Sequence, residues 1–169
     1  IMEAAGLTAA GMYHYFASKE EILDAAIEIG ITRDLDALAE EIEGMPPLEK
    51  LYVFTKGATQ RNSMIVKMRR FQKSHQRSYA TYRIRECEIY AYIPVLGDIL
   101  REGVGQGVFH TDYPRPDAEF MVLVGGTIAS GSSLLPGTGP KGMKERAEAF
   151  FTLIQQWLEA DPEQIAAFL

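Results

Sequence analysis

The chain has 169 residues, of which 47% are apolar, and this suits a compact chain of one domain, or one domain with a small appendage. The single cysteine, Cys87, excludes an internal disulfide framework and a cysteine-based metal site, and the apolar stretches are too short to cross a membrane. No signal segment opens the sequence, so we expect a cytoplasmic protein with no membrane partner, and the net charge of −6 argues at first against nucleic-acid binding.

The charges lie in blocks along the chain. Residues 1–50 carry 11 acidic residues and 3 lysines or arginines, whereas residues 51–85 carry 9 lysines or arginines and no acidic residue. Residues 86–169 return to 12 acidic and 5 basic residues. On helices, such blocks are usually solvated faces that balance each other across the fold.

The hydrophobic pattern predicts helices along most of the chain. Residues 18–43 begin at Ser18, a good N-cap, with Glu21 completing a capping box, and the apolar stripe that follows stops at the glycine and prolines of residues 44–47. Pro94 predicts a kink or a break in a later helix. Because no segment alternates apolar and polar residues as a strand does, we expect an all-α fold. The further helices are predicted over residues 47–61, 63–73, 77–104, 117–135, 144–160 and 163–169.

The first 23 residues predict a helix-turn-helix. The end of one helix, Ile1–Ala5, is followed by a glycine turn at residues 6–7 and by a short helix capped by Thr8. In that geometry the second helix enters the major groove of DNA with its N-terminal residues leading. Met12 and Phe16, four residues apart, form the core face of this helix. The side chains that are then free to contact DNA phosphates are Tyr13, His14, Tyr15 and, at the start of the next helix, Lys19.

The run from Ala4 to Leu23, AAGLTAAGMYHYFASKEEIL, closely resembles the helix-turn-helix signature of the tetracycline-repressor (TetR) family of bacterial transcriptional regulators. Beyond this run the resemblance is architectural: a long connecting helix from Ser18, a glycine-rich run at residues 103–109 and two closing helices. The resemblance implies that the first DNA-binding helix and most of the second precede this chain. We therefore expect a partial helix-turn-helix DNA-binding domain at residues 1–28 and a helical ligand-binding and dimerisation domain at residues 29–169.

The resemblance also assigns the DNA contacts. It implies phosphate contacts from Thr8, Tyr13, Tyr15 and Lys19, and base-edge contacts from Ala9, Ala10 and Gly11, with His14 as a further candidate. Where many relatives carry a polar or basic residue, this chain has alanines at positions 9 and 10, and alanine reads a base edge only by touching a thymine methyl. We therefore expect operator specificity to come from DNA shape or from residues upstream of this chain.

In the TetR family the helices after the helix-turn-helix enclose a ligand pocket. The aromatic residues and methionines of residues 52–96 suit an apolar or amphipathic small molecule, because methionine adapts its shape and tyrosine supplies a polar group. The alternative is that these side chains form ordinary core. An inward-facing arginine from the acid-free block would favour an anionic effector, and the candidates are Arg61, Arg69, Arg70 and Arg83. The pocket candidates are Phe54, Met64, Met68, Phe71, Tyr82, Tyr90 and Tyr92.

Two C-terminal helices predict a dimer interface. Residues 117–135 are apolar on nearly all sides with small residues in the middle, and residues 144–158 offer a second apolar face. In the TetR family two such helices from each subunit form a four-helix interface, so we expect a homodimer that binds a palindromic operator. The alternative is a core within one chain. The interface candidates are Met121, Val124, Gly125, Ile128, Phe150, Phe151, Ile154 and Trp157.

No pattern in the sequence indicates catalysis, a metal site or a cofactor. The three histidines, His14, His75 and His110, are scattered, and neither a nucleophile elbow nor a phosphate-binding loop occurs. We therefore expect a regulator rather than an enzyme, most simply a repressor that binds double-stranded DNA and is released by a small-molecule effector. The alternative is a dimeric helical small-molecule-binding protein without specific DNA binding, which the two alanines and the negative charge favour slightly.

Overall fold

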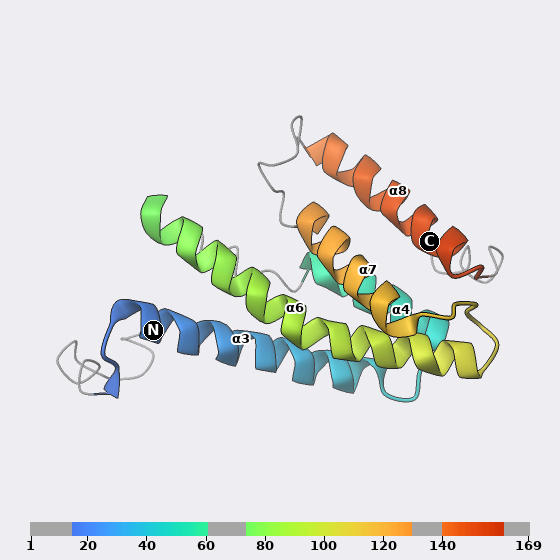
Figure 1. The fold of residues 1–169 in the computed structure, drawn as a ribbon, viewed down its shortest axis with the longest axis horizontal. Coiled ribbons are helices and arrows are strands. Elements are labelled where there is room, and N and C mark those ends of the chain that lie inside the picture. The colour runs from blue at the N-terminus through green and yellow to red at the C-terminus, as the bar shows by residue number, and fades with distance from the viewer. Residues whose placement is uncertain (1–14, 61–73, 130–139, 161–169) are drawn as a thin grey trace.

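The structure, a computed structural model, describes residues 15–60, 74–129 and 140–160, and every regular element in this part of the chain is an α-helix (Figure 1). The prediction of an all-α fold is therefore confirmed for these residues. The helices predicted over residues 63–73 and 163–169 lie outside them. The described helices are α3 (Lys19–Ile42), α4 (Pro47–Gln60), α6 (Ser74–Gly105), α7 (Pro114–Ala129) and α8 (Pro140–Trp157).

α3 begins with the predicted cap. The Ser18 Oγ accepts a hydrogen bond of 3.1 Å from the Glu21 backbone N–H. The Glu21 carboxylate accepts a bond of 2.6 Å from the N–H of Ala17, one residue earlier than in an ideal capping box. α3 then continues without interruption to Ile42. The expected domain boundary at residue 28 therefore falls inside one continuous helix, which belongs to both expected domains.

Pro94 was expected to cause a kink or a break, and α6 passes through it as one helix of 32 residues without a break. A proline inside a helix lacks the N–H that would bond to the carbonyl four residues earlier, which here belongs to Tyr90. Both Pro94 and Tyr90 lie on an exposed face of α6, so water can bond to that carbonyl. Solvent exposure therefore explains why the helix tolerates this proline.

α7 and α8 begin earlier than the hydrophobic pattern predicts. The Thr111 hydroxyl accepts a hydrogen bond of 3.0 Å from the Tyr113 N–H and donates to the buried Asp117 carboxylate, which fixes the entry to α7. Pro114 then occupies the first helical residue, where its missing N–H costs nothing. α8 likewise starts at Pro140 rather than near residue 144. Pro114 and Pro140 are therefore the first residues of these helices.

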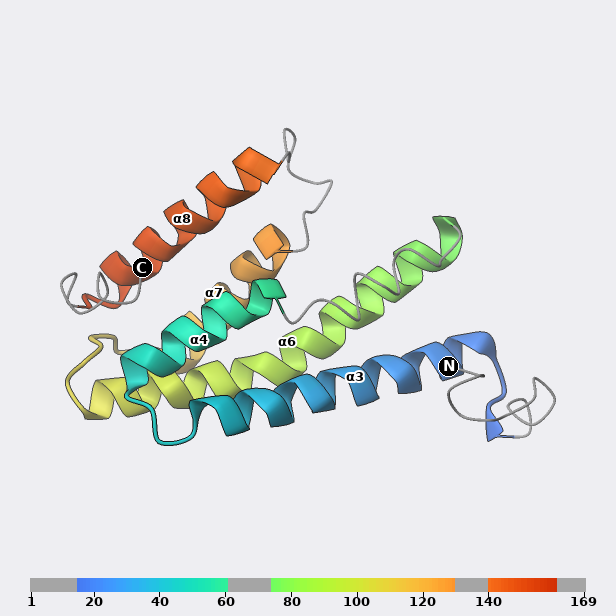
Figure 2. The ribbon, with the colours of Figure 1, turned by 180° about the vertical axis from the view of Figure 1, so that it is seen from behind.

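α6 is the central helix of the fold. It runs beside α3 in the same direction and packs against α3, α4 and α7, while α7 also contacts α8 (Figures 1 and 2). A small apolar cluster of Ile27, Ile31 and Ile84 joins α3 to α6. No helix within the described residues is long and apolar enough to span a bilayer. α3 is thus attached to the other helices largely through α6.

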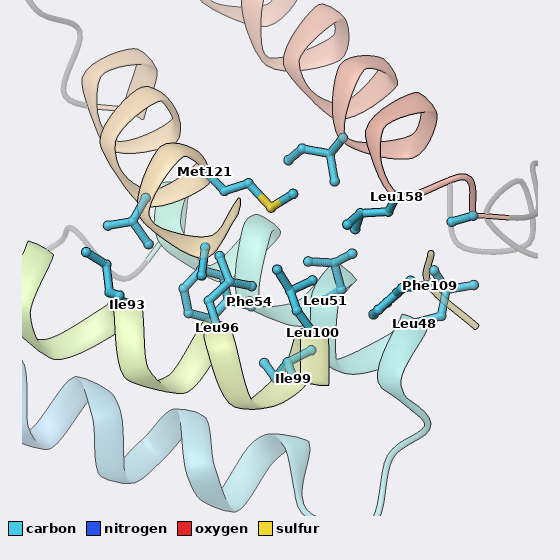
Figure 3. Close-up of a cluster of buried hydrophobic side chains, with 14 of the residues drawn as sticks. Leu48, Leu51, Phe54, Ile93, Leu96, Ile99, Leu100, Phe109, Met121 and Leu158 are labelled. Carbon is cyan, nitrogen blue, oxygen red and sulfur yellow. The ribbon is translucent and has the colours of Figure 1, made fainter. Parts of the chain in front are cut away.

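The main core lies between α4, α6, α7 and α8 (Figure 3). Leu51 and Phe54 of α4 meet Leu96 and Leu100 of α6, and Met121 closes the core from α7. Leu96 and Leu100 are only 1% and 0% exposed. This core fixes the four helices relative to one another, and the same helices form the walls of the cavity described below.

A tight turn closes the end of α6. Gly107 has a φ of 71°, which glycine adopts without strain, and the N–H groups of Val108 and Phe109 donate back to the Gly103 carbonyl at 2.8 and 3.2 Å. The Phe109 ring, 1% exposed, then lies directly over Gly103, where a Cβ atom would overlap it. The His110 N–H donates to the Leu158 carbonyl at 2.9 Å and links this turn to the end of α8.

Candidate functional site

A cavity of about 380 Å³ lies among all five described helices. Its volume falls in the range of small-molecule sites, about 300–1,000 Å³. Most of its lining is aliphatic or aromatic, with a few charged and hydroxyl groups. The lining residues are Asp34, Leu38, Tyr52, Phe54, Thr55, Lys56, Arg85, Glu88, Tyr92, Leu96, Met121, Val122, Gly125, Gly126, Ile128, Ala147, Glu148, Phe150, Phe151, Thr152, Ile154 and Gln155.

Aromatic side chains give the α4 wall of the cavity its shape. Phe54 meets Tyr92 of α6 edge to face, with ring centroids 5.9 Å apart, and Tyr52 meets Phe151 of α8 edge to face at 6.4 Å. The Lys56 ammonium lies 5.2 Å from the centroid of the Tyr52 ring, within the range of a cation–π contact. The wall therefore combines rigid apolar surface with a cation at one edge.

Arg85 reaches from α6 across to α7. Its Nη2 donates to the carbonyls of Val122 and Leu123 at 2.6 and 2.7 Å, and its Nη1 lies 3.4 Å from the Glu88 carboxylate. The guanidinium rests on Gly126, where a Cβ atom would overlap it. The absence of a side chain at Gly126 thus creates the space that brings a cation to the cavity wall.

Two of the predicted pocket residues, Phe54 and Tyr92, line the cavity. Tyr82 and Tyr90 do not, since they are 65% and 76% exposed. Tyr90 lies two residues from Tyr92, so the two side chains leave α6 on different sides, and Tyr82 lies nearly one turn before the first lining residue of α6. The remaining candidates, Met64, Met68 and Phe71, lie outside the described residues.

The cationic side chains that line the cavity, Lys56 and Arg85, are not among the arginines expected from the sequence. Arg83 is turned toward α3 instead, and Arg61, Arg69 and Arg70 lie outside the described residues. Arg85 belongs to the same acid-free block, but that block alone does not tell which of its nine cations faces inward. The pair of small residues at Gly125–Gly126 is the sequence signal that could have pointed to a long side chain crossing here.

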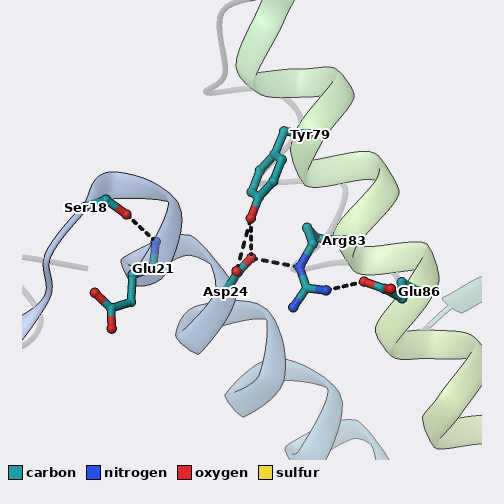
Figure 4. A network of polar contacts seen from close by, with 6 residues as sticks. All are labelled: Ser18, Glu21, Asp24, Tyr79, Arg83 and Glu86. Atoms are coloured by element: carbon teal, nitrogen blue, oxygen red, sulfur yellow. Dashed lines mark hydrogen bonds and ion pairs between the residues drawn. The ribbon is translucent and has the colours of Figure 1, made fainter.

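A polar cluster joins α3 to α6 near the start of α3 (Figure 4). The Tyr79 hydroxyl and the Arg83 Nε each donate to the Asp24 carboxylate at 3.1 Å, and Arg83 also pairs with Glu86. The hydrogen bond to Asp24 raises the pKa of Arg83, and partial burial together with the same carboxylate raises the pKa of the Tyr79 phenol. Both groups therefore keep their protons, and the cluster stays intact, at neutral pH.

Only two of the predicted DNA contacts lie within the described residues. Tyr15 is 72% exposed and Lys19 is also exposed, whereas Phe16, predicted to face the core, is partly buried. Tyr15 and Lys19 thus lie on the accessible surface immediately before and at the start of α3. The other candidates, Thr8, Ala9, Ala10, Gly11, Tyr13 and His14, lie outside the described residues.

The predicted dimer residues divide into two groups. Met121 and Ile154 are 3% and 2% exposed in the core of the single chain, and they also line the cavity together with Gly125, Ile128, Phe150 and Phe151. Val124 is 45% exposed, and Trp157 packs on Phe120 with ring centroids 5.9 Å apart. α7 and α8 therefore have an inner face toward the cavity and an outer apolar face, whose exposed residues are Phe120, Leu123, Val124 and Leu153.

Within the described residues, no group of three or more His, Cys, Asp or Glu side chains is placed to hold a metal ion. Residues 1–26 match the family described as bacterial regulatory proteins, tetR family. No curated protein matches the chain significantly. The matched segment contains the predicted helix-turn-helix and the first part of α3, and the all-α structure fits it. The match at residues 1–26 supports a regulator of the tetR family with its DNA-binding region in this segment.

Proposed function

We infer that this protein is a ligand-responsive transcriptional repressor that binds a palindromic operator in the cytoplasm as a homodimer. Residues 1–28 form part of its DNA-binding domain, and residues 29–169 bind a small apolar or amphipathic effector and hold the dimer together. The family match supports DNA binding. The observation that carries the ligand response is that α6 both lines the 380 Å³ cavity and holds α3, the helix that follows the DNA-binding segment.

The residues of α6 that contact α3 and those that line the cavity lie only a few positions apart in the sequence. Arg83 points to Asp24 on α3, while Arg85 and Glu88 face the cavity and α7. A ligand that shifts this part of α6 by a fraction of a turn therefore also shifts the anchor of α3. Because packed helices move as rigid bodies, α3 transmits that shift to the DNA-binding segment at its N-terminal end.

The outer face of α7 and α8 supports a homodimer. Phe120, Leu123, Val124 and Leu153 are 42–53% exposed and apolar, and Trp157 packs beside them. Exposed apolar side chains gathered on neighbouring helices are typical of a protein–protein interface. A second copy with the same face would bury them around a twofold axis, which matches a palindromic operator.

DNA binding is tested by fluorescence anisotropy with the full-length protein and the DNA upstream of its own gene. We expect saturable binding that weakens steeply with salt, as phosphate contacts require. Replacing the exposed Lys19 by alanine should weaken binding to all sequences and lower the salt slope by about 1. The matched control is Arg101→Ala, which removes an exposed cation on α6 and should leave the affinity unchanged.

The second candidate function is a dimeric small-molecule-binding protein that lacks specific DNA binding. The alanines at positions 9 and 10 and the net charge of −6 favour it. Weak binding that is the same for the upstream DNA and for unrelated DNA, and is unchanged by Lys19→Ala, would support this alternative and contradict the repressor.

A further inference from the structure

Arg85 gives the cavity a cationic group with unused hydrogen-bonding capacity. A guanidinium carries N–H donors on Nε, Nη1 and Nη2. The Nη2 donors bind the backbone carbonyls of Val122 and Leu123, and one Nη1 donor faces Glu88. Among the described residues, Nε–H and the other Nη1 donor meet no acceptor.

The charge of Arg85 is also poorly matched. The two carbonyls are neutral, and the Glu88 contact of 3.4 Å is longer than an ordinary N–H···O hydrogen bond, about 2.7–3.2 Å. The Arg85 side chain is only 23% exposed, so water solvates it incompletely. A partly buried cation that is incompletely solvated and has one long ion-pair contact is stabilised by a second anionic acceptor.

The other lining residues of the cavity indicate which chemical groups the rest of the ligand should carry. The rest of the cavity wall is largely apolar, with Phe54, Leu96, Phe150 and Ile154 among its lining residues. Of the other charged lining groups, Glu148 pairs with Lys144 at 3.5 Å, and Asp34 and Lys56 each have interactions of their own. The fitting molecule therefore has an apolar body and one acidic head group that reaches Arg85.

We propose that the cavity binds amphipathic carboxylates, with the ligand carboxylate accepting hydrogen bonds from the free donors of Arg85. This inference rests on the proposed function of the cavity as the effector site. A volume of 380 Å³ equals about a dozen waters at ~30 Å³ each, which is about the number of non-hydrogen atoms in decanoate. A medium-chain acid therefore fits. Glu88 opposes the bound anion, because its carboxylate lies beside the same guanidinium.

The test is a displacement assay on the full-length protein. The neutral dye N-phenyl-1-naphthylamine reports cavity occupancy through its fluorescence, and decanoate and decan-1-ol compete with it. An uncharged cavity would favour the alcohol, which is the more apolar molecule. We expect decanoate to displace the dye at a concentration at least about tenfold lower than decanol, as a charge-assisted hydrogen bond implies.

Two variants assign this preference to the guanidinium. Arg85→Met should abolish the preference for decanoate while the dye still binds, and the control Arg101→Met, on the exposed part of α6, should keep it. Glu88→Gln removes the opposing carboxylate, so it should strengthen decanoate binding several-fold and leave decanol unchanged. This second variant tests the proposal even if Arg85→Met fails to fold.

The outcomes separate the ligand class from the site itself. If the dye binds but decanoate competes no better than decanol, or if Glu88→Gln leaves decanoate binding unchanged, the carboxylate proposal is overturned and the cavity remains an effector site. If neither the dye nor any competitor binds, both the carboxylate proposal and the proposed ligand response are overturned.

Discussion

Replacing Gly103 by alanine should destabilise the protein by disturbing the turn that follows α6. This turn is hydrogen-bonded to the end of α8. A methyl group at residue 103 would overlap the buried Phe109 ring, and the ring cannot simply retreat, because the Phe109 N–H is bonded to the Gly103 carbonyl and the next residue to Leu158. Overpacking of this kind costs about 1–3 kcal/mol, and the gain in helix propensity offsets up to about 1 kcal/mol of it. We expect a net loss of about 1–2 kcal/mol in the free energy of unfolding, measured by urea denaturation with circular dichroism.

Gly105→Ala is the matched control, two residues further along the same helix. A Cβ atom there has no heavy atom within 4 Å, and the backbone φ of Gly105 is not positive. This variant should therefore be as stable as the parent protein or more stable by up to about 1 kcal/mol. Equal stability of the Gly103→Ala and Gly105→Ala proteins would refute the close contact between Phe109 and the helix.

Three further changes test other parts of the molecule. Ser18→Ala removes the hydrogen bond to the Glu21 N–H and should lower the free energy of unfolding by about 1 kcal/mol, whereas Ser18→Asp should restore it; urea denaturation of both variants checks this. Val124→Asp places a charge on the outer face of α7 and should convert the proposed homodimer to monomers in analytical ultracentrifugation, and an unchanged mass would exclude this face as the interface. Burial raises the pKa of the Cys87 thiol, so the folded protein contains less thiolate near pH 8 than the unfolded chain. Iodoacetamide should therefore label Cys87 slowly in the native protein and faster in urea, and equal rates would contradict this.

Local signals in the sequence predict the start of α3 and its cap. The cap at Ser18 depends on residues within one turn, and the apolar stripe of α3 depends only on helical spacing, so both can be read from the chain directly. The effect of Pro94 is not determined by such local signals. Whether a proline breaks a helix depends on which side of the helix it occupies, and that is fixed by packing against other helices.

The cavity depends on contacts that no local pattern specifies. Of the pocket candidates, Phe54 and Tyr92 line it, whereas Tyr90 is 76% exposed and does not. The position of Arg85 follows from Gly126 on a different helix, about 40 residues later in the chain. Long-range pairs of this kind are set by the tertiary fold, so the sequence indicated a cationic block but not the residue that reaches the cavity.

If the cavity is the effector site, its occupancy changes the affinity of the DNA-binding segment for DNA. The most direct test measures the Kd for the upstream DNA with and without a ligand that saturates the cavity in the displacement assay. We expect that ligand to weaken DNA binding by a factor of about 5–150, and saturating DNA to weaken ligand binding by the same factor, since thermodynamic coupling is reciprocal. A DNA affinity that stays constant while the cavity is filled would show that the cavity does not regulate DNA binding.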